Sequence, residues 1–267
     1  MSNQPVVDHI TQLFYDSIAP QYDLYYSDWD EAVRREAMFL RGIFEKEGFD
    51  ASARILDCAC GIGTQAIGLA AMGFAVTGSD LSAGALAEAR RRAEARGVTL
   101  PLRQADFRAL DEVFSDSFEI VIAMDNALPH MRTPADLCAA IRSITGRLRP
   151  GGLFVASIRD YDRLLAEKPT YSTPYVHKTG QGQRVLFQTW DWQGERYHFI
   201  QYIIDDGETT RLSKFECDYR AVRRQEITAL LRESGCGAVR WEMPEDTGFY
   251  QPIVLARKDL FERGEAP

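Results

Sequence analysis

A turn of small residues beside an acid is the feature of this sequence with the clearest chemical meaning. Residues 55–64 read Ile-Leu-Asp-Cys-Ala-Cys-Gly-Ile-Gly-Thr, an apolar run followed by small side chains. Ala59, Gly61 and Gly63 let a ligand approach the backbone, and the free amides of a following helix would face that ligand. Asp57 stands at the end of the apolar run. The pattern predicts a strand, a ligand-binding turn and the start of a helix.

A second acid, Asp80, follows the next apolar run, 19 residues past Gly61. An acid in this place can bind both hydroxyls of a ribose. The loop and the acid together predict a nucleoside ligand more strongly than a glycine-rich loop alone. Two ligands compete, because Gly61-x-Gly63-x-x-Ala66 also satisfies the dinucleotide fingerprint of nicotinamide oxidoreductases.

Three observations favour S-adenosylmethionine over a dinucleotide. Asp57 would repel a pyrophosphate but attract the ammonium group of S-adenosylmethionine. Asp106 and Phe107, which close the third expected strand, offer an acceptor for an adenine amino group and a ring beside it. A closing strand hairpin also suits a methyltransferase better than a dehydrogenase. We expect Leu81 and Met124 to complete the cofactor site.

The elements that position these residues follow from hydrophobic periodicity. Apolar runs at 55–56, 74–77, 98–103, 118–124 and 153–158 alternate with helical spacing at 64–72, 83–96 and 135–148. This alternation predicts right-handed crossovers and a parallel sheet. Two further helices are expected at 6–18 and 31–47, and Pro150-Gly151-Gly152 is interpreted as a stop before the fifth strand.

Residues 160–215 break this rhythm. Apolar and polar residues alternate at 185–192, 196–204 and 210–217, with turn residues between them, which predicts an inserted antiparallel meander. A helix at 223–234 and two consecutive strands near 238–243 and 252–256 should close the sheet with an edge hairpin. The expected fold is α/β, a doubly wound, mostly parallel seven-stranded sheet. We divide it into an N-terminal helical lid (1–50), a cofactor-binding core (51–159 and 218–267) and an antiparallel cap over the acceptor site (160–217).

At these motifs the chain resembles class I S-adenosylmethionine-dependent methyltransferases, and within them the glycine N-methyltransferase family, from about Tyr22 to Lys258. Leu56–Gly63 resembles that family's D-x-A-C-G-T-G loop. Asp125–His130 resembles its G-N-S-F-A-H segment, and Arg159–Asp162 resembles its R-N-Y-D segment. Two looser matches are Lys214-Phe215 with Tyr219, and Phe249–Pro252.

The resemblance implies an acceptor site. Arg159 would grip the carboxylate of an amino-acid acceptor, with Asn126 beside the acceptor amine. The remaining implied roles are hydroxyls around the carboxylate from Tyr219 and Tyr250, a position near the sulfonium for Tyr22, and pocket shape from His130. Physical reasoning agrees in part, because Arg159 follows a parallel strand at its carboxyl end and its planar fork suits a carboxylate. Arg159 could instead be a structural partner of Asp160 or Asp162.

The sequence departs from the family at several positions. Asp125 replaces the family's glycine and adds a negative charge close to the acceptor, so glycine itself is in doubt as the substrate. Pro129 stiffens the segment before His130. The arginine of the family's second helix has two possible counterparts, Arg34 and Arg35. Asp125 and His130 are candidate proton acceptors.

Composition narrows the function further. The 267 residues carry a net charge of −8, which argues against a nucleic-acid partner. Five cysteines, an odd number, argue against a disulfide framework, and Cys58-x-Cys60 is not zinc spacing, so we expect no metal. No apolar stretch approaches ~18–20 residues, and the start of the chain does not look like a leader. We expect a cytoplasmic protein that does not associate with a membrane and that can form homo-oligomers.

The expected function is methyl transfer from S-adenosylmethionine to the amine of a small molecule, glycine, sarcosine or a related amino acid, by in-line displacement. Two alternatives remain: a methyltransferase with a different acceptor, such as a natural-product hydroxyl or amine, and a non-catalytic S-adenosylmethionine-binding module.

Overall fold

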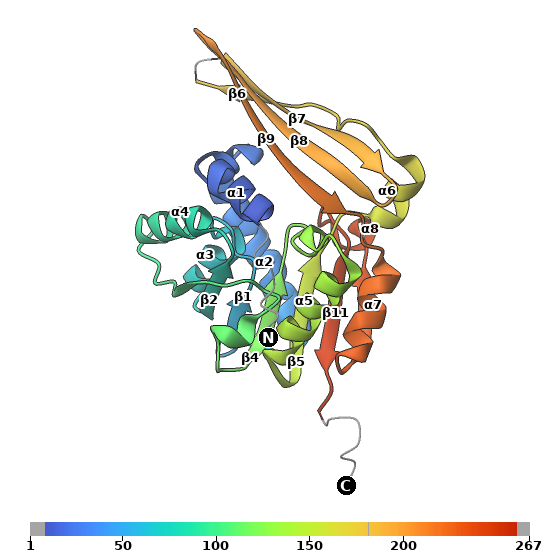
Figure 1. Cartoon of the computed structure of the whole chain (residues 1–267). Coiled ribbons are helices and arrows are strands. Elements are labelled where there is room, and N and C mark those ends of the chain that lie inside the picture. Colours follow the sequence, from blue (N-terminus) through green and yellow to red (C-terminus); the bar gives the residue numbers. More distant parts are fainter. Residues whose placement is uncertain (1–8, 181, 261–267) are drawn as a thin grey trace.

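The structure is a computed structural model, and it describes residues 9–180 and 182–260. Figure 1 shows a large mixed sheet flanked by helices, with a second, smaller sheet above it. The strands of the large sheet are β1 (Arg54–Asp57), β2 (Ala75–Asp80), β3 (Leu102–Gln104), β4 (Phe118–Ala123), β5 (Leu148–Ser157), β10 (Cys236–Glu242) and β11 (Ile253–Lys258). The strands of the small sheet are β6 (Tyr175–Thr179), β7 (Gly182–Gln193), β8 (Arg196–Asp206) and β9 (Thr210–Arg220).

The helices precede, separate and follow these strands. The α-helices are α1 (His9–Ile18), α2 (Trp29–Lys46), α3 (Thr64–Ala71), α4 (Ala83–Glu94), α5 (Pro134–Gly146), α6 (Tyr161–Glu167), α7 (Arg224–Glu233) and α8 (Pro244–Thr247). Three 3-10 turns are η1 (Ala19–Tyr25), η2 (Leu110–Glu112) and η3 (Leu128–His130). Within the described residues, no helix has both the length and the apolar character needed to cross a membrane.

The large sheet has seven strands in the order β10-β11-β5-β4-β1-β2-β3. β1 to β5 are parallel to one another, while β11 runs antiparallel to both β5 and β10. The expected doubly wound sheet and its closing hairpin at the edge are therefore confirmed. A short helix, α8, lies between the last two strands, which the sequence analysis expected to follow each other without a helix.

Period-two alternation in the strands explains why helices cover both faces of the sheet. Ile55, Ile120 and Val155 pack in one core cluster with side chains of α2, α3 and α4. Their chain neighbours Leu56 and Val121 belong to the other cluster, with side chains of α5 and α7. Because successive strand residues point to opposite faces, fully apolar strands require a helical layer on each side.

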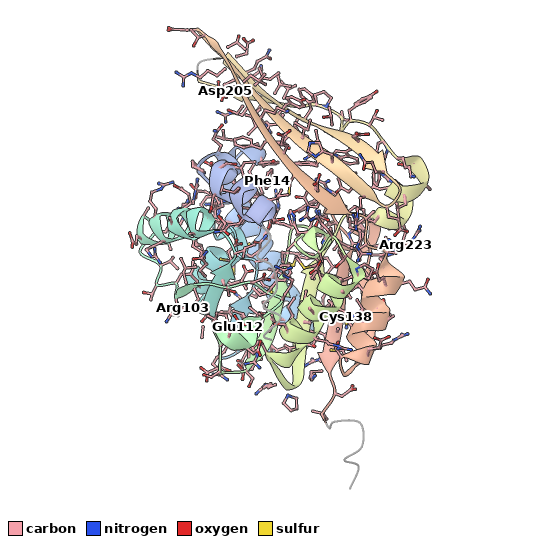
Figure 2. All side chains as sticks on the ribbon, viewed as in Figure 1. Phe14, Arg103, Glu112, Cys138, Asp205 and Arg223 are labelled. Carbon is pink, nitrogen blue, oxygen red and sulfur yellow. The ribbon has the colours of Figure 1, made fainter. Side chains whose placement is uncertain are left out.

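The inserted antiparallel meander is also confirmed, with one strand more than expected. The small sheet has the order β6-β7-β8-β9, and β6 was missed because its sequence, Tyr-Val-His-Lys-Thr, is short and largely exposed. Figure 2 shows Phe14 of α1 on the side of that helix facing this sheet, and its ring meets that of Phe199 edge-on at 6.3 Å between centroids.

One boundary prediction was wrong. Pro150-Gly151-Gly152 does not stop the chain before the fifth strand, because β5 begins at Leu148 and runs through these residues. The register against β4 shifts here, from Phe118 opposite Leu148 to Ile120 opposite Leu153. Gly151 absorbs the irregularity with a φ of +72°, a left-handed value that glycine adopts easily.

Candidate active site

The loop after β1 has the backbone geometry that its small residues suggested. Gly61 and Gly63 take left-handed φ values of +51° and +90°. Gly63 is the N-cap of α3, and a Cβ there would approach the Ile67 side chain to 2.7 Å. The Gly61 amide donates to Asp80 Oδ2 at 2.8 Å, which joins the loop to the end of β2. The loop after β1 and the acid at the end of β2 therefore meet at the carboxyl ends of these two parallel strands.

This loop forms one wall of a hollow that we call the first hollow, which encloses about 870 Å³ with its open mouth included. Its remaining walls come from α1, η1, the residues after β3 and the segment after β4. Its lining includes eight of the ten expected cofactor residues: Tyr22, Ala59, Gly61, Asp80, Leu81, Asp106, Phe107 and Met124. Gly63 and Asp57 do not line it, because Gly63 caps α3 and Asp57 lies behind the loop.

Asp57 is almost completely buried, with 1% of its surface exposed. Its Oδ1 accepts a long hydrogen bond of 3.4 Å from the Ala59 amide, and its Oδ2 has no partner among the described residues. Burial therefore raises its pKa well above the usual value for an aspartate. An unpaired carboxylate oxygen behind a ligand-binding loop favours a cationic ligand.

Asp80 presents its carboxylate at the first hollow. Oδ1 accepts from the Ser82 amide at 2.9 Å, and Oδ2 accepts from Gly61. A carboxylate has about four lone-pair positions, so these two bonds fix its orientation and leave acceptors for a diol. Burial raises the pKa of Asp80, and the two backbone amides oppose that shift.

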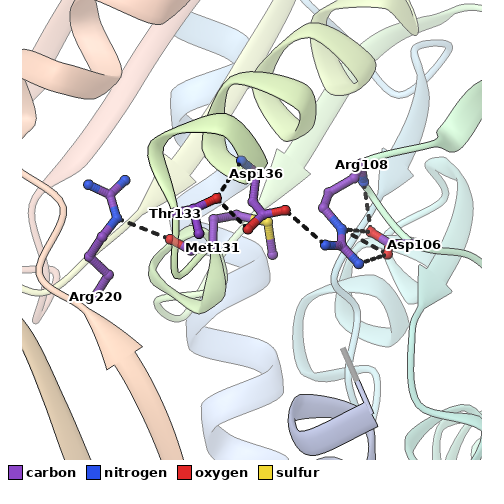
Figure 3. A network of polar contacts seen from close by, with 6 residues as sticks. All are labelled: Asp106, Arg108, Met131, Thr133, Asp136 and Arg220. Atoms are coloured by element: carbon purple, nitrogen blue, oxygen red, sulfur yellow. Dashed lines mark hydrogen bonds and ion pairs between the residues drawn. The ribbon is translucent and has the colours of Figure 1, made fainter. Parts of the chain in front are cut away.

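At the opposite end of the first hollow, Asp106 is held by Arg108. The two form a salt bridge at 2.6 Å, and Arg108 also reaches Asp136 of α5 at 3.1 Å. Figure 3 shows this network continuing to Thr133, whose hydroxyl caps α5 and donates to Asp136. Arg108 lines the hollow, and the sequence analysis missed it because it expected only Asp106 and Phe107 there.

A second hollow adjoins the first and shares Tyr15, Tyr22 and Asp125 with it. It measures about 2280 Å³ with its open mouth included and lies between η1, the segment after β4, the small sheet and the loop before β11. Of the residues assigned to the acceptor site, it is lined by Asn126, Arg159, Tyr219 and Tyr250. His130 lines the first hollow instead.

Arg159 lines an aromatic part of the second hollow. Its guanidinium donates to the Tyr197 hydroxyl and to Gln188 Oε1, both at 3.1 Å. Its Cζ lies 5.1 Å from the Trp190 ring centroid. In the part of the chain that the structure describes, Arg159 has no carboxylate partner.

Arg159 does not pair with Asp160 or Asp162, the alternative that the sequence left open. Asp160 and Asp162, which could have paired with it, pair instead with Arg224, at 2.8 Å and 3.1 Å. The guanidinium of Arg159 is therefore held in position by neutral groups and keeps its charge available to a ligand.

Asp125 and Asn126 form a strained corner after β4. Both have left-handed backbone angles, with φ of +56° and +70°. The Ser157 hydroxyl accepts from the Asp125 amide, and Asn126 Oδ1 accepts from the Arg159 amide at 3.0 Å. Asn126 is 4% exposed and its Nδ2 makes no hydrogen bond of normal geometry with the described residues. Strain of this kind, which costs about 1–3 kcal/mol per residue, collects at ligand-binding sites.

His130 packs inside the protein rather than in the second hollow. Its Nε2 is 2.8 Å from the Tyr15 hydroxyl, and its ring is 4.3 Å from that of Tyr219. Tyr219 in turn stacks on Tyr197 at 5.5 Å. His130 thus shapes the wall between the hollows through its neighbours. Tyr250 is 56% exposed, and its hydroxyl donates to Asp125.

Comparison with known proteins identifies the family. A family model described as a methyltransferase domain matches residues 55–152, the segment that holds the loop, Asp80, Asp106 and the strained corner. The chain is a class I S-adenosylmethionine-dependent methyltransferase. The match decides against the dinucleotide alternative.

Two curated relatives and one solved structure show where this methyltransferase lies within its class. It is 28% identical over 228 residues to a glycine/sarcosine N-methyltransferase of Halorhodospira halochloris, covering 85% of this chain and 80% of that one. It is 30% identical over 158 residues to a glycine/sarcosine N-methyltransferase of Parasynechococcus marenigrum, covering 59% and 55%. The fold is similar to that of an amino pentose methyltransferase from Micromonospora echinaspora bound to S-adenosylmethionine, with a TM-score of 0.69, 21% identity and coverage of 85% and 91%. The methyltransferase therefore spans four fifths of the first relative and about half of the second.

The residues that line the first hollow, and Asp57 behind its loop, fit S-adenosylmethionine. The buried, unpartnered oxygen of Asp57 suits a cationic ligand, and Asp80 offers acceptors for a ribose diol. We propose that Asp106 and Phe107 hold the adenine and that Tyr22 lies beside the sulfonium. The lining also holds Tyr15, which the sequence analysis missed because only tertiary packing brings α1 to the loop.

Proposed function

We propose that this methyltransferase transfers a methyl group to the amine of a small amino acid, with glycine and sarcosine as the first candidates. The observation that carries the proposal is Arg159, a partly buried guanidinium that lines the second hollow without a carboxylate partner in the described chain. A planar fork of this kind binds carboxylates through two parallel hydrogen bonds. The names of the two curated relatives agree with such an acceptor.

Side chains contribute to this reaction mainly by positioning the two reactants, rather than by forming bonds to them. S-adenosylmethionine supplies an electrophilic methyl group on a sulfonium. Arg159 fixes the carboxylate of the acceptor, and Asn126, whose amide nitrogen is a donor without a partner among the described residues, donates a further hydrogen bond to that carboxylate. Tyr15 and Tyr22, which line both hollows, limit the space between them and exclude water from the line of attack. Holding two reactants in line is worth up to ~7–11 kcal/mol.

A second candidate acceptor is an amine on a larger molecule, such as an amino sugar. The observation in its favour is the second hollow itself, which opens to solvent and so leaves room for an acceptor that extends beyond an amino acid. The solved neighbour described above is named as an amino pentose methyltransferase. An acceptor of this class has no carboxylate, so it gives Arg159 no partner.

A substrate panel with matched variants separates these candidates. The enzyme is incubated with S-adenosylmethionine and glycine, sarcosine, dimethylglycine or a free amino pentose, and mass spectrometry detects the gain of a methyl group. For an amino-acid acceptor, Arg159→Ala should raise the acceptor KM about 10–100-fold, because a hydrogen bond to a charged group is worth about 1.5–3 kcal/mol. The KM for S-adenosylmethionine should change little.

The control is Arg223→Ala, an exposed arginine that contacts Glu195 at 3.5 Å. It should leave both constants unchanged. Equal rises of the two KM values in Arg159→Ala, or methyl transfer to the amino sugar alone, would contradict the amino-acid proposal.

A further inference from the structure

A buried carboxylate and a partly buried one share one amide beside the second hollow. Gln65, at the start of α3, donates through Nε2 to Glu36 Oε2 at 2.6 Å and to Asp125 Oδ2 at 2.8 Å. Glu36 comes from α2 and is 2% exposed, and Gln65 is 4% exposed. We call these three residues the carboxylate bridge. It joins two helices and the strained corner, which are far apart in the sequence.

Of the two carboxylates in the carboxylate bridge, only Glu36 has an oxygen without a hydrogen-bond partner in the described chain. Asp125 is fully engaged, because Tyr250 donates to its second oxygen. Glu36 Oε1 has no hydrogen-bond partner in residues 9–180 and 182–260, although it is buried. Leaving a buried charged oxygen unpaired costs about 1–3 kcal/mol or more. Since Glu36 and Asp125 both line the second hollow, the missing donor can come from a molecule bound there.

The charges around the carboxylate bridge indicate which chemical class of molecule supplies this donor. No ion pair of the structure includes Glu36 or Asp125, so these two carboxylates have no counter-ion within 4 Å among residues 9–180 and 182–260. The groups that face it are the hydroxyls of Tyr22, Tyr26 and Tyr250 and the guanidinium of Arg35. Arg35 lines the second hollow, whereas Arg34, the other counterpart considered above, is exposed and paired with Glu31.

The Arg159 guanidinium, without a carboxylate partner, and the carboxylate bridge, without a cation partner, therefore face the same hollow in the described chain. Tyr22 lies within electrostatic range of both, because Asp125 and Glu36 raise its pKa and Arg159 lowers it, on top of the larger effect of burial. A zwitterion with an ammonium at one end and a carboxylate at the other satisfies both charges. An amino acid has this arrangement.

We propose that Glu36, linked to Asp125 through Gln65, binds the ammonium form of the acceptor and accepts the proton that must leave it before methyl transfer. This inference rests on the proposed function and deepens it. The N–H bond breaks and an O–H bond forms on Glu36, which leaves a lone pair on the amine. That pair forms the N–C bond as the S–C bond breaks, and its electrons go to sulfur. The proton on Glu36 passes to solvent when the product leaves.

The electrostatics of the carboxylate bridge suit a proton acceptor at neutral pH. Burial, and then repulsion from Asp125, raise the pKa of Glu36 to about 8, against the opposing hydrogen bond from Gln65 and the charge of Arg35. Burial also raises the pKa of Asp125. A group that titrates near the working pH is an effective acceptor in a proton transfer.

The first test is the pH dependence of kcat/KM for the amino acid that the panel identifies. In the native enzyme kcat/KM should rise through pH 8 as Glu36 loses its proton. Glu36→Gln should lower kcat/KM about 100-fold or more, the usual range for removing a general base. Its rising limb should move up toward the pKa of the free acceptor amine. Glu31→Gln, an exposed change on the same helix, should keep the native profile.

The second test measures protons rather than activity. Glycine is titrated calorimetrically into the complex with S-adenosylhomocysteine at pH 7 in two buffers of different ionisation enthalpy. The native protein should release close to one proton, because the incoming ammonium displaces the proton held by the carboxylate bridge. Glu36→Gln should release none. If Glu36→Gln loses S-adenosylhomocysteine binding and is therefore misfolded, Asp125→Asn serves as the second variant and should reduce the release in the same direction.

The outcomes are distinguishable. Equal proton release and an unchanged pH limb in the folded Glu36→Gln variant would overturn the role of Glu36 while leaving the amino-acid proposal intact. Absence of methyl transfer to every amino acid of the panel would overturn the proposed function, and the inference with it.

Discussion

At the scale of single residues, the site is built from polar groups that the fold leaves without partners. Asp57 Oδ2, Glu36 Oε1 and Asn126 Nδ2 are all buried, and none has a hydrogen-bond partner in the described chain. Each is a cost to the folded protein on its own, since buried polar groups are normally paired. All three lie at or behind the two hollows, so ligands that supply the missing partners can offset this cost.

Asp57 offers a direct measurement of that cost. Its carboxylate is destabilised in the folded protein, as its raised pKa shows, so Asp57→Asn should stabilise the protein without cofactor at neutral pH. We expect a gain of about 1–3 kcal/mol, which corresponds to roughly 2–4 °C in Tm per kcal/mol for a chain of about this size. The same change should weaken S-adenosylhomocysteine binding about tenfold or more. Thermal melts with and without S-adenosylhomocysteine measure both effects.

An exposed acid provides the control for this substitution. Asp116→Asn should change neither Tm nor affinity, because Asp116 lies on the surface. A lower Tm for unliganded Asp57→Asn would mean that this carboxylate stabilises the fold and is not held for a ligand.

The residue scale also shows what sequence could reveal of the site. A motif is recognised from residues close together in the sequence, so spacing and resemblance predict the loop residues, Asp80, Asp106 and Arg159 as site residues. Ala59, Gly61, Asp80, Asp106 and Arg159 line the two hollows, and their roles stay predictions. Glu36 and Gln65 were missed because neither belongs to a motif. They meet only when α2 crosses α3. The one available signal was an acid among the apolar positions of a helix whose other buried residues are mostly aliphatic or aromatic.

At the scale of elements, the sequence predicted strands and helices well wherever the chain alternates between them. Every expected parallel strand is present. In an α/β fold a short, fully apolar run between two helices is buried as a strand of the central sheet, because helices cover both faces of that sheet. The errors fall where local chemistry is ambiguous. Pro150-Gly151-Gly152 is typical of a turn, yet β5 already pairs with β4 at Leu148, before these residues, and pairs with β4 and β11 again from Leu153. α6 and α8 are short, and their sequences carry little periodicity.

The crossing of α2 and α3 is the packing contact that holds the carboxylate bridge together. Gly68 of α3 lies so close to α2 that a Cβ would meet the Val33 carbonyl oxygen at 2.6 Å and Ala37 Cβ at 2.7 Å. Gly68→Ala should therefore push the two helices apart. We expect a net loss of about 1–3 kcal/mol from overpacking, despite a helix-propensity gain of up to about 1 kcal/mol. Urea denaturation measures the change.

A matched control lies on the other helix. Gly42 of α2 has open space where a Cβ would stand, so Gly42→Ala should stabilise the protein by about 0.5–1 kcal/mol. If the two variants change stability in the same direction, the close approach of α2 and α3 does not limit the packing there.

At the scale of the whole molecule, the parallel sheet brings several acids together at the carboxyl ends of its strands. Asp57 ends β1, Asp80 ends β2 and Asp125 follows β4, so their side chains meet where parallel strands share their carboxyl ends. Glu36 joins them from α2. The small sheet and α1 lie over this end of the parallel strands (Figure 1). The burial that creates the site thus also makes its carboxylates costly to ionise.

This arrangement predicts an unusual pH dependence for the stability of the unliganded protein. The pKa values of Glu36, Asp57, Asp80 and Asp125 are all raised by burial, that of Glu36 to about 8. Between the unfolded and folded pKa values of such a group the folded state binds more protons than the unfolded state, so stability falls as pH rises from about 4.5 to 8. Glu119 and Asp136, with lowered pKa values, act in the opposite direction and lose their contribution only as pH falls below about 4.5.

The free energy of unfolding should therefore be greatest near pH 4.5 and decline toward pH 8, and urea midpoints at constant ionic strength from pH 4 to 9 measure this. The double variant Glu36→Gln, Asp57→Asn should flatten the decline, because it removes two of the four groups responsible. General self-repulsion of a chain with net charge −8 also weakens toward acid pH, but salt screens it, whereas buried carboxylates are screened much less. If the decline persists in high salt and disappears in the double variant, the buried carboxylates at the carboxyl ends of the strands cause it. A decline abolished by salt alone would assign it to the surface charge, and the carboxylates at the site would then be less costly to ionise than their burial implies.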